Sequence, residues 1–178
     1  TDDNSRLYKF DSFTYNVNQD LLKGKNVEVI SENFLQNGYS DNAKFTDGFF
    51  NLKNNDFIAG DTKINLKKES FGDINNDPRL YGVSSSKKDK LLTVNKATFT
   101  SCSKSMDCPA WSINANKIKH DQEKRQLIYD NAILKIYNMP VMYLPKFFHP
   151  DPSVKRQSGF LQPIINSSDV LTESIYVP

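Results

Sequence analysis

The sequence predicts an all-β fold, a twisted β-jellyroll or β-roll of stacked antiparallel strands. Apolar and polar residues alternate with the two-residue period of a half-buried strand, and polar turn clusters interrupt this alternation at intervals of roughly thirty to forty residues. No stretch carries the i, i+3, i+4, i+7 apolar stripe of a capped helix. A unit of strand, turn and strand cannot close a core alone, so we expect these units to stack.

The first unit begins with alternating aromatic residues, breaks at a polar turn over 18–20 and resumes at Leu22. Its inward positions Tyr8 and Phe10 are out of phase with Phe13 and Tyr15. A slip of one residue would turn a strand over, so this phase change predicts a bulge or a bend. The segment 7–17 is also our candidate for an exposed edge of the sheet.

The second and third units follow the same plan. In the second, apolar positions from Ala43 to Leu52 and from Phe57 to Leu66 flank a turn at 54–56, and a loop rich in Asp, Asn and Gly covers 69–78. In the third, strands over 80–83 and 91–94 flank a turn predicted over 84–90, and a further strand covers 97–99.

The fourth unit carries the most specific pattern. Trp111, Ile113 and Ala115 alternate with polar residues, a polar turn over 120–126 follows, and a second apolar run leads into Pro140 and Pro145. Prolines five residues apart forbid a helix and remove ladder donors, which predicts an edge or exit segment of the sheet.

Composition and motifs exclude several classes of function. The 178 residues suit one domain with its own core, and 23 basic against 21 acidic residues leave a net charge of +2, which argues against nucleic-acid binding. The sequence has no run of about 18 apolar residues and no signal peptide. It lacks the nucleophile elbow, the zinc-protease helix motif and the P-loop, so neither an enzyme nor a cofactor is expected.

Two weaker catalytic candidates have simpler structural interpretations. Ser158 precedes Gly159 and is expected to form a tight turn. His120 and Asp121 are adjacent, so in a strand they point to opposite faces. We expect this pair to begin a turn in which Asp121 bonds its own backbone.

The two cysteines leave several pairings open. Cys102 and Cys108 are separated by five residues, and His120 and His149 have no Cys or second His close by, so a metal site is not expected. The two thiols are disulfide candidates, because an oxidising compartment favours an oxidised pair, and a free thiol at Cys102 is the alternative.

The fourth unit resembles the signature region of LptD, the OstA-type lipopolysaccharide-assembly proteins of the Gram-negative outer membrane. The resemblance covers roughly a third of the chain, with its elements in the family's order and spacing. They are Thr100-Ser101-Cys102, Trp111-Ser112-Ile113, His120-Asp121, Asn131-Ala132, Pro140-Val141, Tyr143-Leu144-Pro145, Lys155-Arg156 and Ser158-Gly159-Phe160-Leu161.

The resemblance implies a domain organisation and a location. Residues 1–145 would form a periplasmic jellyroll, and 146–178 a Pro-rich exit segment leading to a membrane β-barrel that this chain lacks. The chain would act at the periplasmic face of the outer membrane. In this family, a cysteine at the position of Cys102 is implied to bridge to the barrel.

The resemblance also implies a function in transport. The jellyroll would receive lipopolysaccharide and pass its acyl chains through an apolar groove, because each buried methylene contributes about 0.8 kcal/mol. Candidate groove residues, whose alternative role is ordinary core, are Phe50, Leu52, Ile64, Leu66, Trp111, Ile113, Leu134 and Ile136. Candidate head-group contacts, whose alternative is a solvated basic turn, are Lys146, Lys155 and Arg156.

The implied partners are an LptA-like bridge protein joined by strand pairing at the open edge, the chain's own barrel, and an LptE-like plug lipoprotein. Two alternatives remain. One is a free-standing carrier of the LptA or LptC type, which has no need of the Pro-rich exit. The other is a polysaccharide-binding β-roll, which would require clustered carboxylates or outward stacking aromatics.

Overall fold

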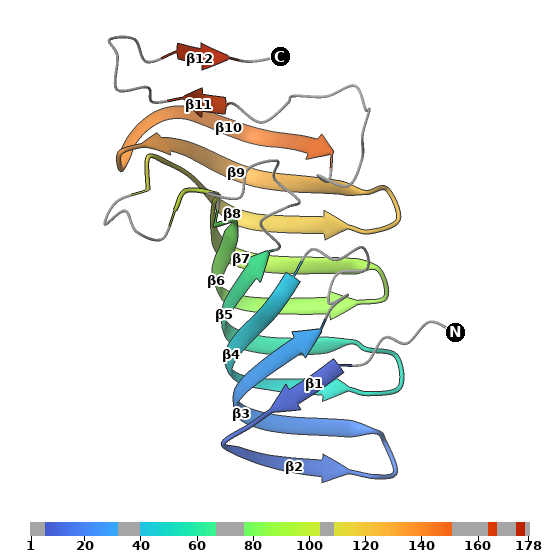
Figure 1. Cartoon of the computed structure of the whole chain (residues 1–178). Helices are drawn as coiled ribbons and strands as arrows, with labels where there is room; N and C mark the ends of the chain where they lie inside the picture. Colours follow the sequence, from blue (N-terminus) through green and yellow to red (C-terminus); the bar gives the residue numbers. More distant parts are fainter. Residues whose placement is uncertain are drawn as a thin grey trace.

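One antiparallel sheet of ten strands forms the body of the protein, so the all-β prediction is confirmed. The computed structural model describes residues 6–31, 40–66, 77–103 and 109–150, together with two short strands, and no helix occurs among these residues. Strands follow one another up the sheet as antiparallel neighbours (Figure 1). The strands are β1 (Arg6–Lys9), β2 (Ser12–Asn16), β3 (Leu21–Ser31), β4 (Ser40–Asn51), β5 (Phe57–Leu66), β6 (Arg79–Lys88), β7 (Leu91–Thr100), β8 (Trp111–Asp121), β9 (Gln126–Ile136), β10 (Met139–Pro150), β11 (Ile164–Asn166) and β12 (Ser174–Tyr176).

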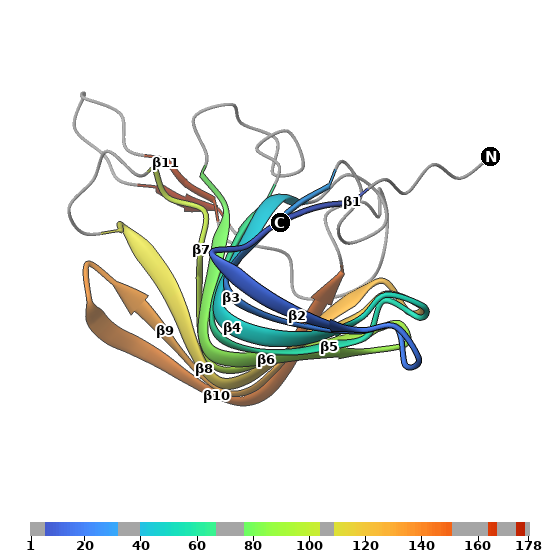
Figure 2. The ribbon, with the colours of Figure 1, turned by 90° about the horizontal axis from the view of Figure 1, so that it is seen from below.

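The sheet is bent into a V by a corner in the middle of its strands (Figure 2). Four residues with left-handed backbone, Asn26, Asp61, Lys96 and Asn131, lie at this corner on β3, β5, β7 and β9, each 35 residues after the last. The corner divides the V into two arms. We call the side that carries the turns 17–20, 52–56, 89–90 and 122–125 the hairpin arm. It consists of residues 12–25, 47–60, 84–95, 117–130 and 146–150. The other side, with residues 6–10, 27–31, 40–45, 62–66, 79–82, 97–100, 111–115 and 132–144, is the loop arm.

The corner explains the phase slip that the sequence shows near its start. β1 and β2 both pair with β3 in one continuous register, although the chain leaves the strand at Phe10 and Asp11. The slip is therefore a bend and not a bulge. In β3, burial changes phase in the same way, because Leu22 and Gly24 are buried before the corner and Val27 and Val29 after it.

The hairpin turns also repeat along the chain. Asp20, Asn55, Asp89 and Arg125 adopt left-handed backbone at successive turns of the hairpin arm. The turn predicted over 84–90 is wrong in its extent, since β6 runs to Lys88 and the turn is confined to 89–90. The serines that suggested a turn instead pair with β7 inside the sheet.

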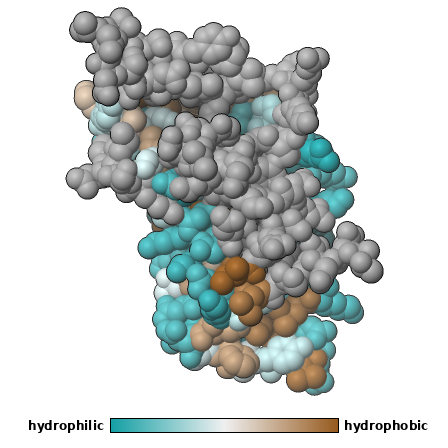
Figure 3. All heavy atoms as spheres, in the orientation of Figure 1, coloured by the Kyte–Doolittle hydropathy of each residue, from teal (hydrophilic) through white to brown (hydrophobic). Residues whose placement is uncertain are grey.

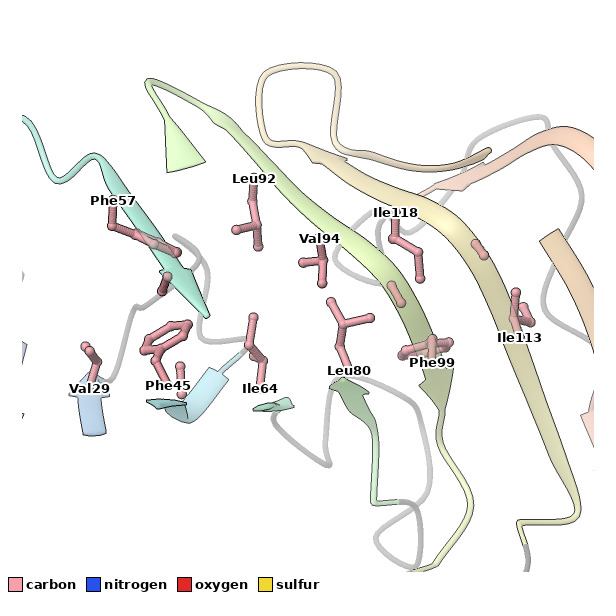
Figure 4. Packing of buried hydrophobic residues seen from close by; sticks show 14 of the residues in the cluster. Val29, Phe45, Phe57, Ile64, Leu80, Leu92, Val94, Phe99, Ile113 and Ile118 are labelled. Atoms are coloured by element: carbon pink, nitrogen blue, oxygen red, sulfur yellow. The ribbon is translucent and has the colours of Figure 1, made fainter. Parts of the chain in front are cut away.

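The concave face of the V holds the hydrophobic core. Side chains from the two arms point into the space between them, as Figure 4 shows for Phe45, Phe57, Leu80 and Val94. The ring of Phe45 on the loop arm lies 5.4 Å from that of Phe57 and 5.7 Å from that of Phe50, both on the hairpin arm. The arms are thus held together by direct aromatic packing.

The two ends of the sheet are its edges. β1 and β2 form one end and β10 the other, and each has a single neighbour among the described strands. Exposed apolar side chains gather at the lower end (Figure 3), where Leu7, Phe13, Tyr15 and Val17 lie. The predicted edge segment 7–17 is therefore an edge of the described sheet. β10 continues through Pro150, past the domain boundary that we predicted at 145.

Candidate lipid-binding site

The concave face of the loop arm carries a continuous row of apolar side chains, which we call the loop-arm row. Strand register places its members side by side from one edge of the sheet to the other. They are Tyr8, Val29, Ala43, Ile64, Leu80, Phe99, Ile113, Leu134 and Met142. From Val29 to Ile113 the row is buried, Leu134 is half-buried, and Met142 on β10 is 45% exposed. The row therefore reaches the surface at the C-terminal edge.

Most of the predicted groove residues lie on this concave face. Ile64, Ile113 and Leu134 belong to the loop-arm row. Trp111 and Ile136 pair with each other two residues farther along the same two strands, β8 and β9. Phe50 is on the facing hairpin arm, where its ring meets that of Tyr8 edge-on at 5.9 Å.

One predicted groove residue is not brought to this face, and a second cannot be assigned to either face. Leu52 lies in the turn after β4 and is exposed, because the strand has ended at Asn51. The side chain of Leu66 lies outside the described residues.

The hairpin arm presents a second row that changes character along the sheet. Register places Leu22, Phe50 and Phe57 beside Lys87, Leu92, His120, Leu127 and His149. The three polar members are buried, and all three lie on strands between β6 and β10. Sequence reasoning missed them as inward residues. Counting alternation outward from the corner would have found them, because each falls on an inward position.

A hydrogen-bonded pair fixes one of these polar residues. His149 Nδ1 lies 2.7 Å from the carbonyl oxygen of Pro150, which can only accept, so this nitrogen donates. His149 Nε2 then accepts from the Tyr129 hydroxyl at 2.9 Å. Complete burial raises the pKa of Tyr129 far above its usual value, which keeps the phenol protonated as a donor.

Lys146, predicted as a head-group contact, lies on the convex face. It is exposed and pairs in register with Asp130, on the side opposite to the neighbouring half-buried Phe147. Lys119 Nζ lies 2.9 Å from Asp130 Oδ2, and this bond, with Lys146 and Lys117 nearby, lowers the pKa of Asp130. Lys146 therefore belongs to a convex-face charge cluster. Lys155 and Arg156 lie outside the described residues.

Cys102 is a buried free thiol at the end of the loop arm. Its Sγ accepts a hydrogen bond from the backbone N–H of Trp111 at 3.4 Å, and Arg79 donates to its carbonyl oxygen. These contacts tie the ends of β6, β7 and β8 together. Cys108 lies outside the described residues, so its pairing with Cys102 stays a prediction.

Of the remaining chemical candidates, Ser158 lies outside the described residues, and Asp121 has a structural role. Asp121 Oδ1 accepts from the backbone N–H groups of Glu123 and Lys124 at 3.1 and 3.0 Å, as predicted. The turn predicted over 120–126 is wrong in its extent, because His120 and Asp121 still belong to β8 and the turn covers 122–125. Within the described ranges, no group of three His, Cys, Asp or Glu residues could hold a metal ion. No helix in that part of the chain is long and apolar enough to cross a membrane.

Sequence comparison finds relatives named LPS-assembly protein LptD. The chain is 35% identical over 85 residues to the LPS-assembly protein LptD of Polaromonas sp. and 38% identical over 85 residues to that of Legionella pneumophila strain Paris. These matches cover 46% and 48% of the chain but only 10% of each relative. A longer match, 26% identical over 147 residues, joins 78% of the chain to 18% of the LptD of Idiomarina loihiensis.

Among solved structures, the chain is similar to LptH of Pseudomonas aeruginosa, described as the LptA homologous periplasmic component of the lipopolysaccharide transport device. That similarity has a TM-score of 0.48 and 11% identity, and covers 67% of this chain and 77% of LptH. No family model matches the chain. The resemblance to LptD that the sequence predicted is confirmed by the named relatives.

Proposed function

We propose that this chain is a periplasmic module of an LptD-like lipopolysaccharide-assembly protein, which receives lipopolysaccharide and passes its acyl chains along the concave face. One observation supports this most strongly. The loop-arm row is apolar across the whole sheet and becomes exposed only at β10. Such a row suits movement of an acyl chain, because each methylene keeps apolar neighbours at every step.

Binding of an acyl chain has a free-energy cost, because the loop-arm row is buried. Ile64 and Ile113 are almost fully buried, so an acyl chain must exchange with contacts that these side chains now make. Each buried methylene of the lipid returns about 0.8 kcal/mol, which can offset the contacts that are lost. No bond is made or broken in this scheme, so the module acts as a carrier and not as an enzyme.

The edges supply the proposed contacts with partners. Strands β1 and β2 end the described sheet with outward backbone groups, which suits pairing with a strand of an LptA-like bridge protein. At the other end, β10 carries Pro140 and Pro145, which disfavour further strand addition and suit an exit toward the chain's own barrel and an LptE-like lipoprotein. With these two contacts, we infer that the module acts at the periplasmic face of the outer membrane.

Site-specific photocrosslinking tests the carrier function. A photoreactive residue at Ile113 on the concave face should form an adduct with lipopolysaccharide, and one at Asn114 should not, because Asn114 faces the convex side of the same strand. Equal labelling at both positions, or none at either, would show that the concave face is an ordinary core.

A substitution gives the second arm of the test. Ile113→Asp places a carboxylate in the loop-arm row and should abolish adducts formed at neighbouring Leu134. Asn114→Asp is the matched control on the other face and should leave those adducts unchanged. Far-UV circular dichroism of both variants separates loss of binding from loss of fold.

A further inference from the structure

The turn of the β9–β10 hairpin, at the end of the loop arm, differs in composition from the turns of the hairpin arm. The four turns of the hairpin arm, 17–20, 52–56, 89–90 and 122–125, are dominated by charged and amide side chains. The β9–β10 turn instead consists of Tyr137 and Asn138, both with positive φ, and apolar residues follow it. We call Tyr137, Met139, Val141, Met142 and Tyr143 the apolar tip.

The apolar tip is exposed and held in place. Its side chains are 45–70% exposed, with Met139 the highest. Positive φ at both turn residues is the geometry of a two-residue hairpin turn whose twist matches that of the strands. The backbone N–H of Tyr137 also donates to the carbonyl oxygen of Ala110 at 3.0 Å, and the Tyr143 hydroxyl donates to Asn131 at 2.7 Å. The exposed groups therefore sit on a fixed support.

Both faces of the hairpin end are apolar. Met142 belongs to the concave loop-arm row, whereas Tyr143 pairs with Ile133 on the convex face. A protein partner docked on one face would leave the other face in water. A lipid interface surrounds a hairpin end on both sides, so it accounts for exposed apolar groups on both.

The charges near the tip point to the same environment. From Asn131 to Pro150 the chain contains no Asp or Glu, although 21 acidic residues occur in its 178. Lys135, two residues before the turn, pairs in register with Pro140 at the base of the tip. Carboxylates would be repelled by anionic lipid, and a lysine at this depth can contact lipid phosphate. Tyrosines, here Tyr137 and Tyr143, favour the boundary between head groups and acyl chains.

We propose that the apolar tip inserts into the head-group region of an anionic lipid bilayer and docks the sheet on the membrane surface. The exposed end of the loop-arm row, at Met142, then opens directly into the bilayer. This docking does not depend on lipopolysaccharide transport, because a sheet that carried no lipid would still bury the same side chains.

Vesicles of phosphatidylethanolamine and phosphatidylglycerol test the proposal. Met139→Trp introduces a reporter at the tip, and Asn54→Trp introduces one in a polar turn of the hairpin arm as the matched control. The native Trp111 is buried and provides the same background in both. On adding vesicles, the emission of Met139→Trp should shift to the blue and be quenched by brominated lipid, and that of Asn54→Trp should not.

Two further variants measure the forces involved. Met139→Ser combined with Val141→Ser should weaken vesicle binding at least about tenfold, since each side chain loses apolar burial. Lys135→Gln should weaken binding to these vesicles but not to neutral phosphatidylcholine vesicles. Unchanged urea unfolding and unchanged lipopolysaccharide adducts at Ile113 would show that the fold and the carrier function persist in both variants.

Three outcomes would overturn the proposal. The unmodified chain could fail to float with vesicles of any composition, or both tryptophan reporters could be quenched equally. Alternatively, the serine variant could convert a dimer to a monomer in sedimentation velocity without changing vesicle binding, which would make the tip a contact between copies of this chain.

Discussion

The N-terminal strands and the C-terminal strands of the sheet fill the inside of the corner, which we call the crease, in opposite ways. In β3–β5 the hairpin arm supplies small residues, Gly24, Gly48 and Ala59, and the loop arm supplies Val27 and Phe45. In β7–β9 the loop arm supplies Ala97, Ala115 and Ala132, and the hairpin arm supplies Val94, Ile118 and Tyr129. In these strands a larger residue of one arm faces a smaller residue of the other, which suits the close packing of a core.

The exchange of roles occurs between β5 and β6. There Thr62 of the loop arm donates a hydrogen bond of 2.6 Å to Ser85 of the hairpin arm, and both side chains are buried. Two side chains of intermediate size therefore meet at the point where neither arm supplies the larger residues. The comparison teaches that complementarity between the arms, and not the chemistry of either arm, holds the bend.

The largest effect is expected from emptying the N-terminal crease. Phe45→Ala removes a ring that contacts Phe50 and Phe57 and leaves only small residues behind it, so unfolding free energy should fall by about 3–5 kcal/mol. Urea unfolding measures this. The matched control Phe49→Ala lies on the exposed convex face of the same strand and should cost far less. Equal losses would contradict the aromatic contact between arms.

Overfilling the crease at its crossover should come next. A Cβ added at Gly82 would collide with the Val94 side chain, so Gly82→Ala should cost about 1–3 kcal/mol. Val94→Ala in the same chain should recover part of that loss. Gly60→Ala is the control, because its Cβ would meet only the flexible end of Asp47. No recovery in the double variant would refute the steric explanation.

The hydrogen bond at the crossover allows a double-mutant cycle. Thr62→Val or Ser85→Ala alone leaves a buried hydroxyl with its partner removed and should cost about 1–3 kcal/mol. The two together should cost clearly less than the sum, since no unmatched hydroxyl remains. Additive costs in urea unfolding would show that the hydroxyls are not coupled.

A smaller gain is expected at the corner itself. Lys96 adopts left-handed backbone, whereas the other three corner residues in this series are Asn or Asp, which tolerate it better. Lys96→Asn should therefore raise the unfolding free energy by about 1 kcal/mol. Lys63→Asn, at an ordinary strand position, should not. A loss of stability in Lys96→Asn would mean that the lysine side chain contributes more than its backbone costs.

The smallest effect concerns charge on the convex face. Because Lys119 lowers the folded-state pKa of Asp130, this pair stabilises the fold above the unfolded pKa of about 3.8, and the contribution is lost as pH falls through the folded value. Asp130→Asn should cost about 0.5 kcal/mol at pH 7 and less than that at pH 2. The pair of half-buried Glu28 and exposed Lys44 in the N-terminal half provides a comparison. An equal cost of Asp130→Asn at pH 7 and at pH 2 would exclude this contribution of the ion pair.

The sequence by itself determined the strands, their alternation and their resemblance to LptD, because side-chain period and turn composition are local properties. It also contained the corner, visible as the phase slip between Phe10 and Phe13. The same slip separates Val94 from Ala97, where it suggested two strands although β7 is continuous. A local pattern cannot distinguish a bend from an interruption, because neighbouring strands decide which occurs.

Only the tertiary structure decided which side chains share a face of the V. It placed Lys146 on the convex side, Leu52 in a turn, and His120 and His149 among the inward residues. These positions depend on counting outward from a corner whose location is set by register across the sheet. The matching of large and small residues in the crease is likewise invisible in the chain, because the partners are brought together only by the bend.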